Sequence, residues 1–474
     1  MEQTAVKPKE PKRNVFARFG SGLRSRLAGF YHRFRDGSPG TKLAHFVMGA
    51  GNFFHGQIVK GLLFFGLQAA YALFMIGCPE VNGTPLGWKA LVNLVTLGTN
   101  PGDIFTPTDN SMLMLLYGVV TLGITALYLY AWGANLRSSY KADKDAHSRG
   151  KAASFREDCQ ELLDKRFHIT MLTPAIIGVM LFTVLPTVFM ILIAFTNYDK
   201  LHPAGQVLFD WVGLDNFTAL FTNPNGEISA RFLPVLSWTF IWAFFATFLN
   251  YFGGMILALM INKKGIRGKL LFRTIFVLTI AIPQFISLLA MRNLIGEYGP
   301  FQKFLMEIGI LAEPMSFLAN ATNVWTARIS VIVINLWVGV PYSMLMISGI
   351  LPNIPKDMYE AAELDGAPKI VTFFKITLPY VFFITTPYLI SSFIGNITSF
   401  NIIYLLTGGL PKVTGGYIAG GTDLLVTWLY KLTIDEQQYN LGAVIGIMTF
   451  LITSAITLVT YRRSKSYREE DTFQ

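Results

Sequence analysis

Polar side chains recur at helical spacing inside two of the most apolar stretches of the chain. Each stripe has three members at positions i, i+4 and i+7, so a helix places them on one face. The members are Asn335, Gly339 and Tyr342 in the first stretch and Ser392, Asn396 and Ser399 in the second. Amides and hydroxyls offer donors and acceptors, a phenol adds a flat apolar ring, and glycine permits close approach. The stripes suit a neutral, hydroxyl-rich solute such as a sugar, although spacing alone favours hydrogen bonding between helices equally.

A charged segment, EAAELDGAPKIVTFFKITLPY, separates the two stripes and runs from Glu360 to Tyr380. A short helix is expected to begin near Pro355, with Asp357 in its first turn, and to stop at Gly366. Ala361 and Ala362 keep this helix slim, so it fits a narrow cleft in which Glu360 reaches a cation.

A second short helix is expected to begin at Pro368 and to end at Pro379. Four of its side chains are expected to hold it against the rest of the protein, namely Ile370, Phe373, Phe374 and Thr377. The segment therefore predicts a two-helix knob. An ordinary interfacial loop explains any single one of these features.

The composition predicts the class of protein that must position these residues. Of 474 residues, 52% are hydrophobic and only 14% are charged, whereas soluble domains carry roughly 25% charged residues. The balance indicates a polytopic membrane protein. Two cysteines, Cys78 and Cys159, provide neither a disulfide framework nor metal-ligand spacing, and no cleaved signal peptide is expected at the start.

Eight stretches are apolar over the roughly 17–25 residues that a bilayer-spanning helix needs, which predicts an all-α fold of about eight transmembrane helices. None of them contains Asp, Glu, Lys or Arg. They are 61–77, 112–132, 169–195, 232–261, 274–291, 329–351, 380–406 and 441–461. Prolines inside these spans, Pro283 among them, are expected to kink their helices.

Lysine and arginine in the connections predict the orientation. With the N-terminus inside, 30 of the 39 Lys and Arg residues fall in cytoplasmic segments and 8 in external ones. Both termini are therefore expected in the cytoplasm. The net charge of +10 then follows from orientation against anionic lipid, and nucleic acid need not be invoked.

The chain is expected to contain five parts. They are a basic cytoplasmic arm (1–42), an interfacial helix with two transmembrane helices (43–136), a charged cytoplasmic linker (137–168), a six-helix core (169–461) with a cytoplasmic loop at 352–380, and a cytoplasmic tail (462–474).

The motif E-A-A, two residues, D-G-A and then I-T-L-P resembles the coupling motif of ATP-binding-cassette (ABC) importer permeases. LLTGGLP at 405–411 and TDLLVTWLYKL at 422–432 extend the resemblance over the six-helix core. The chain resembles the permease subunit of maltose and maltodextrin importers (the MalF type), which implies a type I importer core plus two N-terminal helices. The segment between the third and fourth spans is short where well-known members carry a large external insertion, so contact with the external binding protein must differ in part.

The resemblance implies roles for residues of both regions. In the loop, Glu360 pairs with a basic group of a separate ATPase and Gly366 allows the bend; the coupling motif comprises Glu360, Ala361, Ala362, Asp365, Gly366 and Ala367. Asn335, Gly339, Tyr342, Ser392 and Asn396 match oligosaccharide-contacting positions. At neighbouring contact positions, where the best-known member has other residues, this chain has Val338, Gly395 and Ser399.

The resemblance also implies the assembly and its location. The expected partners are a homologous second permease, two copies of a cytoplasmic ATPase and an external sugar-binding protein, in a prokaryotic cytoplasmic membrane. No G-x-x-x-x-G-K-[ST] phosphate loop occurs in the chain, so no enzyme activity or cofactor is expected here, and ATP and Mg²⁺ belong to the partner ATPase.

Two other classes of protein are disfavoured. An ion-coupled secondary transporter needs charged groups inside the membrane, and the predicted spans contain none. A membrane-embedded enzyme needs a cluster of His, Asp or Glu, and the six histidines are scattered along the sequence.

Overall fold

The computed structural model describes residues 31–222, 228–263, 265–320, 323–413 and 419–463. Helices dominate, and the described residues contain one strand pair, an antiparallel hairpin of β1 (Glu80–Val81) and β2 (Thr84–Pro85). The chain divides into two compact units. The first comprises Met1–Met190 with Pro203–Asp210, and the second comprises Ile191–His202 with Trp211–Gln474. The predicted all-α fold is confirmed.

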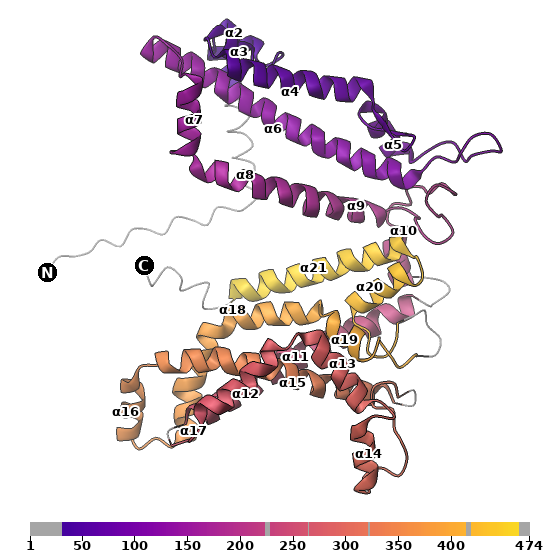
Figure 1. Ribbon diagram of the computed structural model, residues 1–474, viewed down its shortest axis with the longest axis vertical. Coiled ribbons are helices and arrows are strands. Elements are labelled where there is room, and N and C mark those ends of the chain that lie inside the picture. The colour runs from indigo at the N-terminus through magenta and orange to yellow at the C-terminus, as the bar shows by residue number, and fades with distance from the viewer. Residues whose placement is uncertain (1–30, 223–227, 264, 321–322, 414–418, 464–474) are drawn as a thin grey trace, which may run out of the picture. The chain divides into compact units, whose positions relative to one another are not determined.

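In the first unit, α2, α3, α4 and α5 pack against the long helix α6 (Figure 1). The helices of this unit are α2 (Pro39–Leu43), α3 (Ala50–Phe54), α4 (Ile58–Gly77), α5 (Trp88–Thr96), α6 (Ser111–Arg149), α7 (Phe155–Leu163) and α8 (Phe167–Val179), with a π-helical turn at Met180–Val184, and α9 (Leu185–Ile193) runs from the first unit into the second. Buried polar side chains of α6 hold α2 and α3. Asp143 accepts a hydrogen bond from the Ser38 N–H at 2.7 Å, and the Asn135 amide oxygen accepts one from the Gly49 N–H at 2.8 Å.

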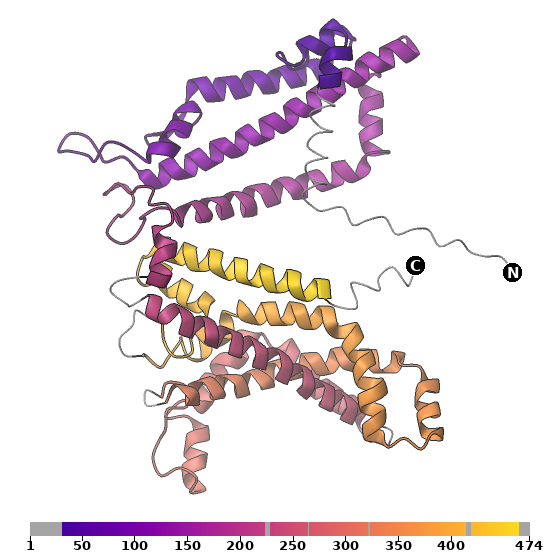
Figure 2. The same cartoon turned by 180° about the vertical axis from the view of Figure 1, so that it is seen from behind.

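The second unit contains the residues with predicted roles. Its helices are α10 (Asp215–Thr222), α11 (Ser229–Asn262), α12 (Lys269–Ala281), α13 (Gln284–Ile295), α14 (Pro300–Glu307), α15 (Val324–Ile350), α16 (Lys356–Leu364), α17 (Lys369–Thr372), α18 (Leu378–Ile397), α19 (Asn401–Leu406), α20 (Leu425–Ile434) and α21 (Tyr439–Arg463). A 3₁₀ turn covers Leu351–Asn353 and a π-helical turn covers Phe373–Thr377. Within this unit, α16 and α14 lie at opposite ends (Figures 1 and 2).

Seven helices of the described chain are long and apolar enough to cross a membrane, and a bent pair raises the number to eight. The pair is α12 with the helical segment 284–307, bent by 94°. The kink predicted at Pro283 is confirmed, but the predicted bounds 274–291 are wrong, because the chain forms two helices here rather than one kinked helix. Pro283 supplies no N–H to continue α12, and Ile282 before it is extended, as the residue preceding a proline prefers.

Two predicted boundaries near α18 are also wrong. Pro379 does not end a helix, because 369–397 runs continuously through the π-helical turn into α18. Pro379 lies in the first turn of α18, directly after that wider turn, where its missing N–H and its ring are tolerated. The predicted span 380–406 instead breaks between Ile397 and Asn401.

The core of the second unit forms around α11, which packs along α15. A Cβ atom added at Gly254 of α11 would lie 2.4 Å from Cβ of Ser343 on α15, so glycine permits this close approach. Aromatic side chains fill the cluster at one end of α11, where Trp238 and Trp242 are fully buried. Tyr251 fills a second cluster with α18, and its hydroxyl lies 2.8 Å from Thr385 Oγ1. The first cluster packs α13, α15 and α19 against α11, and the second packs α15 and α18 against it.

Candidate functional site

Helix α16 begins and ends as its sequence predicts. Pro355 is its N-cap residue and Asp357 lies in its first turn. Gly366 adopts a φ of 68°, the left-handed conformation that glycine favours. The Gly366 N–H bonds Glu363 O at 3.0 Å and the Ala367 N–H bonds Ala362 O at 2.9 Å, which together form a Schellman motif. The predicted bend is therefore located at Gly366.

Side chains on one face of α16 anchor it to the helix that leads into α18. The Tyr359 hydroxyl lies 2.9 Å from Thr377 Oγ1, and Ile354 before the helix is buried. The Tyr380 hydroxyl donates a hydrogen bond to Asn353 O at 3.0 Å. Of the four residues expected to hold the second helix, Phe373 and Thr377 do pack inward. Ile370 and Phe374 are exposed, because they lie four residues apart on the opposite face of that helix.

The other face of α16 is open. Glu360, Ala361, Asp365 and Gly366 are exposed, while Ala362 and Ala367 are half-buried. Leu364 is 90% exposed, although it is a large apolar side chain. An acidic group beside an uncovered leucine and a small alanine suits a groove on another protein. Leu364 was not predicted from the sequence as part of this surface. Its position one helical turn after Glu360 could have indicated that the two side chains share a face.

We predict that Gly366→Ala weakens this helix end by about 1 kcal/mol, the cost of an L-residue in the left-handed region. No atom lies within 4 Å of the position that the new Cβ occupies, so the backbone alone is tested. Limited trypsin cleavage at Lys369 should be about fivefold faster. Gly366→Asn is the control, since asparagine tolerates this conformation better and should restore most of the protection. Equal cleavage rates in all three proteins would contradict the prediction.

The polar stripe of α15 lies against α11. Asn335 is only 3% exposed, and no described group bonds its Nδ2 atom. A Cβ at Gly339 would lie 2.1 Å from Nδ2 of Asn250, so the glycine makes room for that amide. The Oδ1 atom of Asn250 also has no partner among the described residues. Two buried amides with unused hydrogen-bonding groups therefore occur along α11 and α15, which is costly unless a ligand or water completes them.

The stripe of α18 meets the same helix. Asn396 donates a hydrogen bond from Nδ2 to Thr247 Oγ1 at 2.9 Å. Ser392 is half-buried and Gly395 is exposed on the same helix. Ser399 lies beyond the end of α18 at Ile397, so it does not continue the stripe as the spacing predicted.

Helix α11 supplies polar residues that the sequence analysis missed. Thr247 and Asn250 stand three apart within FFATFLNYFGG, and each adjoins one predicted stripe. An amide and a hydroxyl three residues apart in an apolar segment could have indicated a third polar stripe. The two predicted stripes therefore each contact α11, Gly339 at Asn250 and Asn396 at Thr247.

A cavity of about 270 Å³ lies where α12 breaks from α13. Tyr342 and Val338 of α15 line it together with Trp337, and Gln284 and Ser287 of α13 add an amide and a hydroxyl. Tyr342 also lies 6.0 Å from Tyr388 between ring centroids. An aromatic wall with neighbouring amide and hydroxyl groups offers a sugar ring both an apolar face and hydrogen bonds.

A buried ion pair supports the loop that follows α19. The Lys431 ammonium donates to Asp423 Oδ2 at 2.7 Å, as does the Gly420 N–H at 2.7 Å. Asp423 is 0% exposed. Burial raises the pKa of its carboxyl above the ordinary value, while Lys431 acts in the opposite direction. Gly409 leaves the space, since a Cβ there would lie 2.1 Å from Asp423 Oδ1.

Long apolar helices, with the exposed helix α16 at one end of the second unit, define a multi-pass membrane protein. Residues 250–463 match the model of the family described as "Binding-protein-dependent transport system inner membrane component". Two of the relatives described below are at least 32% identical to this chain over 90% of its length. The chain belongs to this family of multi-pass inner-membrane permease subunits.

Three relatives show what kind of permease the chain is similar to. A galactooligosaccharides transport system permease protein, GanP of Bacillus subtilis, is 34% identical over 90% of this chain and 98% of its own length. A maltodextrin transport system permease protein, MalC of Streptococcus pneumoniae, is 32% identical over 90% of this chain and 96% of its own. The maltose/maltodextrin permease MalF of Escherichia coli is 35% identical over 56% of this chain and 51% of its own. The resemblance inferred from the motif is confirmed.

Proposed function

We propose that this chain is the permease subunit of an ABC importer for a neutral oligosaccharide, either a maltodextrin or a related sugar. Relatives matching over nearly the whole chain are named as permeases for maltodextrin and for galactooligosaccharides. The amide and hydroxyl groups around α11 are uncharged, as recognition of a neutral sugar requires. The exposed face of α16 is the main support for the proposal, because it offers a surface to which a separate ATPase subunit can bind.

The proposed assembly contains a homologous second permease, two copies of a cytoplasmic ATPase and an external sugar-binding protein. The ATPase subunits hold ATP and Mg²⁺, so this chain performs no covalent chemistry. Both termini and α16 then lie in the cytoplasm, in agreement with the distribution of Lys and Arg.

The proposed mechanism uses α16 as a lever. Closure of the ATPase dimer moves α16, and the Tyr359–Thr377 contact passes the displacement to the helix that continues into α18. Helix α18 carries Asn396 against Thr247 of α11, so the movement changes the polar region between α11, α15 and α18. Coupling follows if α16 is placed differently in the inward-open and outward-open states.

The proposed substrate residues are Asn335, Val338, Gly339, Tyr342, Ser392, Gly395, Asn396 and Ser399. Asn396→Leu tests them. We expect about tenfold lower sugar uptake, the effect of roughly 1.4 kcal/mol lost from contacts to sugar hydroxyls. Receptor-stimulated ATP hydrolysis should persist in part, because α16 is untouched.

Thr247→Val is the matched control for this prediction. It removes the same interhelical hydrogen bond but leaves the Asn396 amide in place. If Thr247→Val lowers uptake as much as Asn396→Leu does, the stripe is structural and the proposed substrate role is wrong. Uptake assays with maltotriose and galactotriose in vesicles carrying the assembled importer measure both variants.

A further inference from the structure

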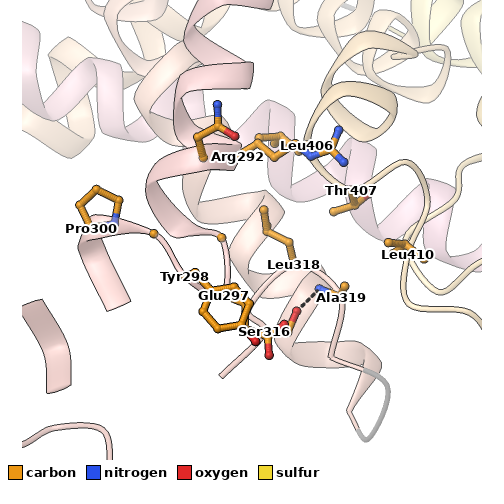
Figure 3. Close-up of a pocket in the computed structure, with 13 residues that line it drawn as sticks. Arg292, Glu297, Tyr298, Pro300, Ser316, Leu318, Ala319, Leu406, Thr407 and Leu410 are labelled. Atoms are coloured by element: carbon orange, nitrogen blue, oxygen red, sulfur yellow. Dashed lines mark hydrogen bonds between the residues drawn. The ribbon is translucent and has the colours of Figure 1, made fainter. Parts of the chain in front are cut away.

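A larger cavity, of about 460 Å³, lies at the end of the second unit that is opposite α16. Its walls come from the end of α13, the start of α14, the loop before α15 and the end of α19 (Figure 3). It contains none of the residues for which the sequence predicted a role. Its volume is within the roughly 300–1,000 Å³ of small-molecule sites. We call it the outer cavity.

The turn between α13 and α14 forms one wall of the outer cavity. The Gly299 N–H bonds Gly296 O at 2.8 Å. A Cβ at Gly299 would lie 2.4 Å from Leu294 O, so only glycine allows the chain to turn this closely. The tight turn presents the side chains of Glu297 and Tyr298 outward, where Figure 3 shows them beside Ser316.

The opposite loop is held by a buried amide. Gln302 of α14 is fully buried, and its side chain accepts a hydrogen bond from the Met315 N–H at 3.0 Å and donates one to Met315 O. The next residue, Ser316, accepts a hydrogen bond at Oγ from the Ala319 N–H at 3.2 Å. The polar wall is therefore positioned before any ligand arrives, which lowers the entropic cost of binding.

The lining combines an apolar floor with a polar rim. Leu318 and Leu406 are buried and form the floor. The rim carries the Arg292 guanidinium, the Glu297 carboxylate and the phenol of Tyr298, which is 80% exposed. No cationic group of the described chain lies within 4 Å of the Glu297 carboxylate, although Arg292 lines the same cavity. One positive and one negative group disfavour a strongly charged ligand, while both bond hydroxyls strongly.

We propose that the outer cavity binds one end of a neutral oligosaccharide on the external side of the membrane. This proposal rests on the proposed function and adds a second sugar site to it. Tyr298 covers an apolar face of the terminal ring, and Arg292, Glu297 and Ser316 bond its hydroxyls. Sugar is thereby held at the mouth of the permease before it reaches the region around α11.

Protection of an engineered thiol tests the outer cavity in the assembled importer without its external binding protein. Cys78 and Cys159 are replaced by Ser, and Ser316→Cys places one thiol in the cavity wall. Alkylation by a water-soluble methanethiosulfonate is timed with maltotriose, with galactotriose, and with sorbitol as a polyol without a ring. We expect one of the trisaccharides to slow the reaction about fivefold at four times its dissociation constant, and sorbitol to leave it unchanged.

Three variants separate local binding from other effects. Glu313→Cys, exposed on the same loop but outside the cavity, should react at the same rate with and without sugar. Tyr298→Ala should abolish protection of the Ser316→Cys thiol, whereas Asn396→Leu should leave it intact. Absence of protection, equal protection at position 313, or its loss with Asn396→Leu would each overturn the proposal.

Uptake, measured in the same vesicles after the external sugar-binding protein has been added, distinguishes this proposal from the proposed function. If the cysteine-substituted importer takes up sugar but the Ser316→Cys thiol is not protected, the outer cavity proposal alone is wrong. If the wild-type importer takes up neither trisaccharide, the proposed function is wrong.

Discussion

Glu360→Lys is expected to reduce sugar uptake by at least about 30-fold while the subunit still reaches the membrane. Glu360 is exposed on α16 and makes no contact that holds the helix, so the fold should tolerate the change. In the proposed complex the carboxylate is buried against a basic group of the ATPase. Loss of one partner of such a pair costs about 2–5 kcal/mol, and a reversed charge adds repulsion.

Glu313→Lys is the matched control for this charge reversal. Glu313 is also exposed but lies in the loop after α14, at the other end of the second unit. Uptake by the Glu313→Lys importer should stay near the wild-type rate. Uptake and co-purification of the ATPase are measured together. A Glu360→Lys importer that retains full uptake and its ATPase would refute the coupling role.

Lys431→Met is expected to destabilise the protein by about 3–5 kcal/mol, because it leaves the fully buried Asp423 carboxylate without its cation. The thermal unfolding midpoint of the purified protein in detergent measures this loss. Lys412→Met is the matched control, since Lys412 is an exposed lysine in the same loop. Its unfolding midpoint should stay within the error of the wild type.

The penalty of Lys431→Met should shrink as the pH falls. Burial already raises the pKa of Asp423 in the folded protein, and removal of Lys431 raises it further. A carboxyl whose pKa is higher in the folded protein than in the unfolded chain favours the folded state fully at a pH below its unfolded pKa. This stabilisation is lost as the pH rises through the folded-state pKa. Combining Lys431→Met with Asp423→Asn should recover most of the stability at neutral pH. No recovery in the double variant would show that the lysine acts through packing alone.

The coupling segment shows how far local sequence determines structure in this protein. Helix α16 and its left-handed stop depend on Pro355, Asp357 and Gly366, which act within one or two turns of the chain. The same local reasoning failed at Pro379. A π-helical turn just before this residue absorbs the proline, and no simple pattern announces such a turn.

The candidate substrate residues show the opposite case. Helical spacing correctly placed Asn335, Gly339 and Tyr342 on α15, because periodicity is a property of one helix. It did not reveal that Asn396 bonds Thr247 of α11, or that Asn250 of α11 occupies the space that Gly339 leaves. Which helices become neighbours depends on the packing of whole faces, which is decided between segments far apart in the chain.

Composition, segment length and short-range backbone chemistry were sufficient to predict the membrane class, the apolar segments and the coupling motif. The orientation expected from the Lys and Arg residues stays a prediction. Three features could not be predicted from the sequence: the 94° size of the turn at Pro283, the exposure of Leu364, and the outer cavity between α13, α14 and α19. Each of these depends on contacts between residues distant in sequence, where side-chain volume and the space left by neighbouring helices determine which groups meet.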